Sequence, residues 1–172
     1  MDNPTFKLLA VWGLLTVVSF PTAGHSAEPA REAEAEVRQA ADAFYAALNS
    51  MFTGDMGPMN AIWSHAPDVT NMGPFGDRQV GWKEVGAQFK REAKMKLGGW
   101  VVPQDVLVRV SGDLGYTVCI EHGEHMSAAG KPITVEHRAT NIFRREAGKW
   151  QLVHHQTDLS EALQKASGQD KK

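Results

Sequence analysis

The most informative stretch of this sequence is residues 138–158, RATNIFRREAGKWQLVHHQTD. Both halves are rich in β-branched and aromatic residues, and Gly148 lies in the turn region between them, so the pattern predicts a β-hairpin. If Gly148 is the positive-φ residue of a three-residue loop, Thr140 lies opposite His154. This register determines which side chains share a face of the hairpin.

Both faces of the predicted hairpin are mixed in polarity. The first changes from apolar near the turn to polar further away, and carries Trp150, Leu152, Ile142, Thr140, His154, Arg138, Gln156 and Asp158. The second carries Phe143, Val153, Asn141, His155, Ala139 and His137. Pattern alone therefore does not identify the buried face.

The chain before this hairpin divides into helical and then strand-like segments. Apolar residues at spacings of three and four predict a long helix from Glu32 and another over residues 82–93, with a short helix between them that Asp55 would cap. Alternating patterns bounded by turn residues then predict long antiparallel strands at 101–111, 114–126, 133–146 and 149–157. A short helix is expected from about Ser160. Helices followed by strands indicate an α+β fold.

Composition limits the class of protein. The chain has 172 residues, 42% of them hydrophobic, and a net charge of -2, which is typical of one globular domain. Its 18 basic residues do not exceed its 20 acidic residues, so no nucleic-acid partner is expected. The single cysteine excludes an internal disulfide. Seven histidines invite a metal hypothesis, but neighbouring pairs such as His154 and His155 point to opposite faces of a strand, so no metal and no cofactor are expected.

The N-terminal residues resemble a secretory signal peptide. Lys7 precedes an apolar run over residues 8–20, and small residues follow it. The run of about 13 residues is shorter than the ~20 that a membrane-spanning helix needs. We expect residues 1–27 to be a cleaved signal, so that the mature protein is periplasmic or secreted with no stable membrane insertion. One domain over residues 32–166 and a polar tail over 167–172 would remain.

Several motifs in one order resemble a known family. They are FYAALN at 44–49, Trp63, DVTNMGP at 68–74, and the two halves of the hairpin at 138–158. Together they resemble the SnoaL-like branch of the ketosteroid-isomerase-like superfamily, also called nuclear transport factor 2-like, over about residues 36–160. The resemblance implies a cone-shaped barrel, with N-terminal helices packed against a strongly curved antiparallel sheet and a pocket in the mouth. It also implies a homodimer through the outer sheet face, and it favours the face of Arg138, His154 and Trp150 as the inner one.

The resemblance does not carry over the isomerase chemistry. Ketosteroid isomerases use a tyrosine in the first helix and an aspartate base after the second, and these positions fall on Phe44 and Gly73, with Tyr45 one step away. Gln156 stands where related sequences often carry a second histidine. Whether the protein is an enzyme therefore stays open.

The candidate site residues come from the hairpin and from the segment around the second helix. His154 would act as a general acid or base, or else be a satisfied histidine bonded to Thr140. Arg138 would bind an anionic ligand group or form a cross-strand ion pair with Glu121, and Asp158 would contact the ligand or cap the last helix. The remaining candidates for the ligand-binding wall are Glu121, Gln156, Trp63, Met72, Phe75 and Trp82.

We expect an exported small-molecule-binding protein whose ligand has an apolar body and a polar or anionic group. The alternatives are an enzyme of isomerase, cyclase or hydrolase type that uses His154, and a structural dimer without a ligand.

Overall fold

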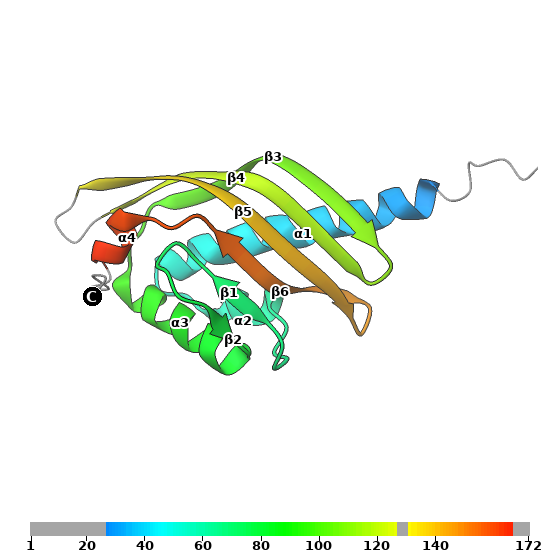
Figure 1. Cartoon of the computed structure of the whole chain (residues 1–172), viewed down its shortest axis with the longest axis horizontal. Coiled ribbons are helices and arrows are strands. Elements are labelled where there is room, and N and C mark those ends of the chain that lie inside the picture. The colour runs from blue at the N-terminus through cyan, green and yellow to red at the C-terminus, as the bar shows by residue number, and fades with distance from the viewer. Residues whose placement is uncertain (1–26, 127–130, 167–172) are drawn as a thin grey trace, which may run out of the picture.

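A computed structural model describes residues 27–126 and 131–166 and has the predicted α+β architecture. Figure 1 shows helices packed beneath a curved sheet, with the longest helix running across its concave side. The predicted signal sequence up to residue 26, the polar tail at 167–172 and residues 127–130 lie outside the described residues.

The helices form where apolar periodicity predicts them. Helix α1 spans Ala27–Phe52, α2 spans Gly57–Ile62, α3 spans Trp82–Met95 and α4 spans Glu161–Ala166. Asp55, predicted to cap α2, lies one residue before the N-cap position, which is Met56. Its Oδ1 still accepts a hydrogen bond from the Gly57 amide at 2.9 Å, in the first turn of the helix. The predicted inner face of α3 is buried at Val85, Phe89 and Ala93.

The sheet has six strands in the order β2-β1-β6-β5-β4-β3. Strands β3 (Trp100–Ser111), β4 (Leu114–Met126), β5 (Pro132–Glu146) and β6 (Lys149–Thr157) form the predicted antiparallel meander. Strand β1 (Thr70–Met72) pairs in parallel with β6, and β2 (Gln79–Val80) pairs with β1. The short β2 was not predicted, since two residues carry no usable periodicity.

The predicted register of the last hairpin is wrong by one residue at the turn. Glu146 pairs with Lys149, so the loop has two residues, Ala147 and Gly148, with φ values of 48° and 79°. Positive φ at both positions is the geometry that matches strand twist in a two-residue hairpin. Alanine rarely adopts this conformation, so the sequence does not reveal the shorter loop.

A bulge in β6 changes which face its side chains occupy. Phe143 pairs with Leu152 but Ile142 pairs with His154, which leaves Val153 as an extra residue in β6. Before the bulge Trp150 and Leu152 face inward, and after it His155 and Thr157 do.

The expected inner face is therefore correct for Trp150 and wrong for His154 and Arg138. Because the turn is one residue shorter than predicted, Trp150 pairs with Arg145 and shares its face with the odd-numbered residues of β5, which are buried from Val135 to Phe143. The Arg138 side chain is on the other face and is 82% exposed. The straight register assumed for β6 fails at the bulge, since one inserted residue exchanges the two faces of the strand beyond it.

The core lies between α1, α3 and the concave face of the sheet. Phe44, Trp63, Phe143 and Leu152 are among its fully buried side chains. Within residues 27–126 and 131–166, no helix is both long enough and apolar enough to cross a membrane.

Candidate functional site

A cavity lies on the inner face of the sheet, between α1, α3 and strands β4 to β6. Its apolar wall includes Leu48, Phe52, Phe75, Phe89, Val101 and Val135. Its polar wall includes Asn71, Glu92, Glu121, His125, His137 and His155. An apolar pocket with a few convergent polar groups is the usual form of a small-molecule site.

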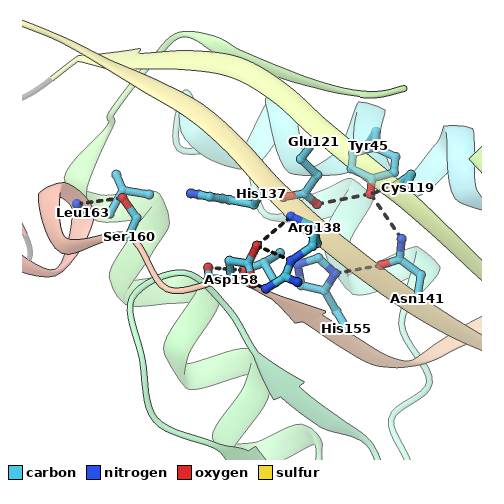
Figure 2. Close-up of polar contacts among 11 residues, drawn as sticks. Tyr45, Cys119, Glu121, His137, Arg138, Asn141, His155, Asp158, Ser160 and Leu163 are labelled. Carbon is cyan, nitrogen blue, oxygen red and sulfur yellow. Dashed lines mark hydrogen bonds and ion pairs between the residues drawn. The ribbon is translucent and has the colours of Figure 1, made fainter. Parts of the chain in front are cut away.

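The inner end of the cavity is organised by a buried hydrogen-bond network around Tyr45 (Figure 2). Tyr45 Oη donates to Glu121 Oε1 at 3.1 Å and accepts from Asn141 Nδ2 at 3.2 Å. Its oxygen also lies 3.2 Å from the Cys119 sulfur. His155 Nδ1 donates to Asn141 Oδ1 at 2.7 Å, which joins β6 to the same network. The network fixes the positions of Glu121 and His155 at the edge of the cavity.

Glu121 and His137 are the polar pair that the network leaves incomplete. Glu121 is 3% exposed, and its Oε2 lies 3.9 Å from His137 Nδ1. His137 Nδ1 is buried without a hydrogen-bond partner in the described part of the chain, and so is Asn71 Oδ1. Buried polar atoms without partners are costly, so these atoms mark where a water molecule or a ligand group would be stabilised.

Burial determines the protonation of this site. Desolvation raises the pKa of Glu121 to about 8, against the lowering effect of the Tyr45 hydrogen bond. The pKa of Tyr45 is also raised, mainly by burial, so the phenol remains protonated. At neutral pH Glu121 therefore holds a proton and can donate it to a neighbouring acceptor.

The three cavity histidines are neutral at pH 7. Burial lowers the pKa of His155 to about 3 and also lowers the pKa values of His125 and His137. His125 Nδ1 lies 3.0 Å from the Gly98 carbonyl oxygen, to which it donates in its neutral form. The cavity therefore offers imidazole groups as neutral donors and acceptors rather than as cations.

Glu92 supplies a second buried carboxyl from α3. It is 6% exposed, and Gln88 Nε2 donates to its Oε1 at 2.7 Å. Desolvation raises the pKa of Glu92 to about 7, with Gln88 and Arg91 opposing the shift. Its charge at neutral pH is thus sensitive to what occupies the cavity.

Arg138 and Asp158 pair with each other on the outside of the sheet rather than with a residue of the cavity. Arg138 Nη2 lies 2.9 Å from Asp158 Oδ1, and Arg138 Nε donates to Asp158 Oδ2 at 3.0 Å. The expected ion pair with Glu121 is wrong, because Glu121 pairs with His137 across the strands and Arg138 pairs with Ile120. Asp158 makes no capping bond to α4, whose first turn is bonded instead by Ser160 Oγ at 3.4 Å from the Leu163 amide.

His154 and Gln156 also lie away from the cavity. His154 Nδ1 lies 2.6 Å from Thr70 Oγ1, so its partner is Thr70 rather than the expected Thr140. Burial lowers the pKa of His154, and a hydrogen bond to the side chain of Gln156 opposes this. Gln156 is exposed and pairs with Thr140 across the hairpin. The structure therefore places His154 in a contact between β1 and β6.

The aromatic and methionine candidates are divided between the core, the surface and the cavity. Phe75 lines the cavity, as expected for a wall residue. Trp63 is buried in the core beside Phe89, and Trp82 stacks on the surface residue His65 at 4.3 Å between ring centroids. Met72 is half-buried at the end of β1.

The two positions aligned with isomerase catalytic groups are close to the cavity but carry no such chemistry. Gly73 lines the cavity. Phe44 is fully buried and packs against His155, with ring centroids 5.0 Å apart. The hydroxyl on α1 comes instead from Tyr45, which is directed to Glu121. Across residues 27–126 and 131–166 no group of three metal-ligating side chains converges.

Sequence reasoning missed His137, His155, Asn141, Asn71 and Glu92 as site residues. Three of them, His137, Asn141 and His155, lie on the hairpin face that the resemblance did not favour, and Asn71 lies on the short strand β1. Glu92 was detectable, because it lies three residues after Phe89 on the buried face of α3, where a carboxyl group is unusual.

The family comparison agrees with this architecture. Residues 37–159 match the SnoaL-like domain, so the chain belongs to the SnoaL-like domain family. A search of curated proteins finds no match.

Solved structures share the fold at low sequence identity. A candidate dehydratase of the NTF2-like family from Streptomyces avermitilis is 24% identical, with a TM-score of 0.64, covering 74% of this chain and 95% of its own. A candidate ketosteroid isomerase from Shewanella frigidimarina is 17% identical, with a TM-score of 0.57, covering 70% of this chain and 92% of its own. The CaMKII hub of S. rosetta is 20% identical, with a TM-score of 0.57, covering 77% and 97%. These similarities establish the nuclear transport factor 2-like fold.

Proposed function

We propose that the protein binds a small organic molecule in the inner cavity, with the apolar body of the ligand against α1 and α3 and its polar group at Glu121 and His137. The observation that carries this proposal is the buried pair itself. Glu121 Oε2 and His137 Nδ1 lie 3.9 Å apart beside a cavity, and His137 Nδ1 has no partner in the described part of the chain. A ligand hydroxyl, carbonyl or amine between them would satisfy both groups.

The size of the cavity favours a compact ligand. The space open to the centres of water-sized molecules is about 30 Å³. Adding back the radius of a water molecule gives a void of roughly 150 Å³ if its shape is compact, the size of an engineered protein cavity that binds benzene. A single ring with one polar substituent would therefore fit.

The proposal is tested by a thermal-shift screen of small ring compounds on the wild type and on His137→Ala. Ligands of the cavity are expected to raise the melting temperature of the wild type and to raise that of His137→Ala by much less. His154→Ala is the matched control and should respond as the wild type does. An equal loss of response in both variants, or in His154→Ala alone, would exclude the inner site.

A second candidate function is acid/base catalysis on the same ligand. Glu121 favours it, because burial raises its pKa to about 8 and the neutral His137 acceptor lies beside it. General acid/base catalysis of this kind contributes about 100- to 10,000-fold to a rate. If the protein is an enzyme, Glu121→Gln should lower kcat by such a factor, whereas His154→Ala should leave kcat unchanged.

We also propose that the protein is a homodimer through the outer face of β3 and β4. Exposed apolar side chains gather there, namely Trp100, Val102, Leu107, Leu114 and Tyr116. A large apolar patch on a soluble protein is typical of an interaction surface. The S. rosetta relative is named a hub. Sedimentation should show a dimer for the wild type and a monomer for Leu114→Glu combined with Tyr116→Glu.

The predicted signal peptide supports export as part of the proposed function. Residues 1–27 carry the charged, apolar and small-residue regions of a secretory signal. N-terminal sequencing of the protein from the periplasm or medium should find a start near residue 27. An intact Met1 on the exported protein would contradict cleavage.

A further inference from the structure

The described lining of the cavity holds carboxyl groups but no basic side chain that is charged at pH 7. Its lining contains two carboxyl groups, Glu92 and Glu121, and within the described residues it contains no lysine or arginine. The histidines that share the lining have pKa values lowered by burial and carry no charge at pH 7. An anionic ligand would thus enter a buried site without a cation to balance it, which is strongly unfavourable.

Glu121 is the carboxyl group with the least internal compensation. Its contacts are the Tyr45 hydroxyl at 3.1 Å and the neutral His137 ring at 3.9 Å. No basic side chain of the described chain contributes to its pKa. Glu92 differs, because Gln88 donates to it directly and Arg91 lies near enough to stabilise its charge. A cation placed in the cavity would therefore gain most at Glu121.

A second feature points to a ligand at the same place. His137 is 6% exposed and lines the cavity, yet its Nδ1 has no hydrogen-bond partner in the described structure. Asn71 is 1% exposed, also lines the cavity, and leaves its Oδ1 unpaired. In a neutral histidine one ring nitrogen is an acceptor, and an amide oxygen is always one. Two unpaired groups that can accept hydrogen bonds, in the same lining as the Glu121 carboxyl group, suit a ligand group with several N–H donors.

The apolar wall is also suitable for a cation. Phe52, Phe75 and Phe89 line the cavity, and the faces of aromatic rings attract positive charge. The same rings bury the apolar body of the ligand.

We infer that the ligand of this cavity is a compact organic cation, a protonated amine on a single ring, whose ammonium group pairs with the Glu121 carboxylate and donates to His137 or Asn71. This inference rests on the proposed function, since it assigns a chemical class to the ligand of the same site. The sequence favoured an anionic ligand group because of Arg138. Arg138 lies on the outer face of the sheet, so an organic cation takes the place of that expectation.

The test compares three ligands with one body and different charges. Benzylamine, benzyl alcohol and benzoate are titrated calorimetrically into the mature protein at pH 7. Benzylamine is expected to bind at least about tenfold more tightly than benzyl alcohol, and benzoate is expected not to bind.

A pair of variants locates the charge preference. Glu121→Gln keeps the shape of the side chain and the acceptor for Tyr45 but removes the negative charge, so benzylamine should lose its tenfold advantage and benzyl alcohol should bind as before. Glu136→Gln is the matched control on β5, since this carboxyl is exposed and on the outer face. The control should behave as the wild type. Glu92→Gln should have a smaller effect than Glu121→Gln, because Glu92 already has Gln88 as a donor.

Proton release gives an independent readout. Free Glu121 is protonated at pH 7, and the pairing requires its carboxylate form, so binding of benzylammonium should release a proton to the buffer. The binding enthalpy should therefore differ between phosphate and Tris buffers for the wild type. The buffer dependence should be reduced in Glu121→Gln.

The outcomes separate the inference from the proposed function. If benzyl alcohol or benzoate binds as tightly as benzylamine, or if Glu121→Gln keeps the preference for the amine, the inference is overturned and the small-molecule site remains. If none of the three ligands binds at millimolar concentration, the proposed function fails as well. Preferred binding of benzylamine with proton release and loss of the preference in Glu121→Gln supports both.

Discussion

The two faces of β5 both carry polar side chains, but they place them in opposite environments. On the inner face Asn141 and His137 are buried, and Asn141 bonds to Tyr45, Thr117 and His155. On the outer face Arg138 is 82% exposed and pairs with Asp158. The comparison teaches that polarity alone does not identify the solvent side of this sheet, because the inner face uses polar groups to build a cavity wall.

The largest expected difference between the faces is in stability. Asn141→Ala removes the acceptor of His155 and a donor to Tyr45, and leaves both groups buried, so it should cost about 3 kcal/mol of unfolding free energy. The adjacent Thr140→Ala changes the outer face and should cost less than about 0.5 kcal/mol.

Urea unfolding of the two variants measures this difference. Equal costs at Asn141 and Thr140 would mean that the Asn141 network contributes little, and the distinction between the faces would be lost.

An effect of intermediate size is expected from the buried carboxyl groups of the inner face, which make the free energy of unfolding depend on pH. Glu121 has a folded-state pKa of about 8, raised from 4.5, so the folded protein binds more protons than the unfolded chain between these values. Stability should therefore fall as pH rises through this range, by at most about 1.4 kcal/mol per pH unit from this group. Glu92, with a pKa raised to about 7, acts in the same direction.

The inner histidines act in the opposite direction. His155 has a pKa lowered from 6.5 to about 3, so stability from this group is lost as pH falls from 6.5 toward 3. Above pH 6.5 the histidine no longer contributes, so denaturant unfolding from pH 4 to 9 should show a net loss of stability between about pH 6.5 and 8, where the two carboxyl groups titrate. In Glu121→Gln the loss on the alkaline side should be shallower, whereas Glu136→Gln should follow the wild type. An unchanged alkaline slope in Glu121→Gln would indicate that Glu121 is ionised in the folded protein.

The smallest effect is expected on the outer face. Arg138→Ala removes an exposed ion pair with Asp158, and exposed pairs contribute little to stability. Neither the melting temperature nor the affinity for a cavity ligand should change measurably. A clear loss of affinity in Arg138→Ala would show that the ligand contacts the outer face and that the assignment of the cavity is wrong.

Much of the fold could be predicted, because long elements carry repeated signals. The period of α1 and α3 and the alternation of β3 to β6 each involve many residues, so single exceptions do not obscure them. The short strands β1 and β2 have two or three residues each, and the parallel pairing of β1 with β6 depends on contacts distant in sequence.

The site could not be predicted in the same way, because one inserted residue in β6 determines which of its side chains face the cavity. The extra residue Val153 exchanges the faces of β6, so His155 occupies the side on which His154 was expected. Nothing in the local sequence distinguishes Val153 from an ordinary strand residue. Glu121 was identified as a site residue, but its partners were not, since they depend on the register of β4 with β5.

The most direct test of the inner site is the response of two histidines to one ligand. In a titration with benzylamine followed by ¹H–¹⁵N spectra of the imidazole groups, the His137 resonances should shift and saturate with the calorimetric affinity, because its unpaired Nδ1 lines the cavity. The His154 resonances should stay in place, because its Nδ1 is bonded to Thr70 on the other face. Shifts confined to His154 would contradict the account and place the ligand on the outer face of the sheet.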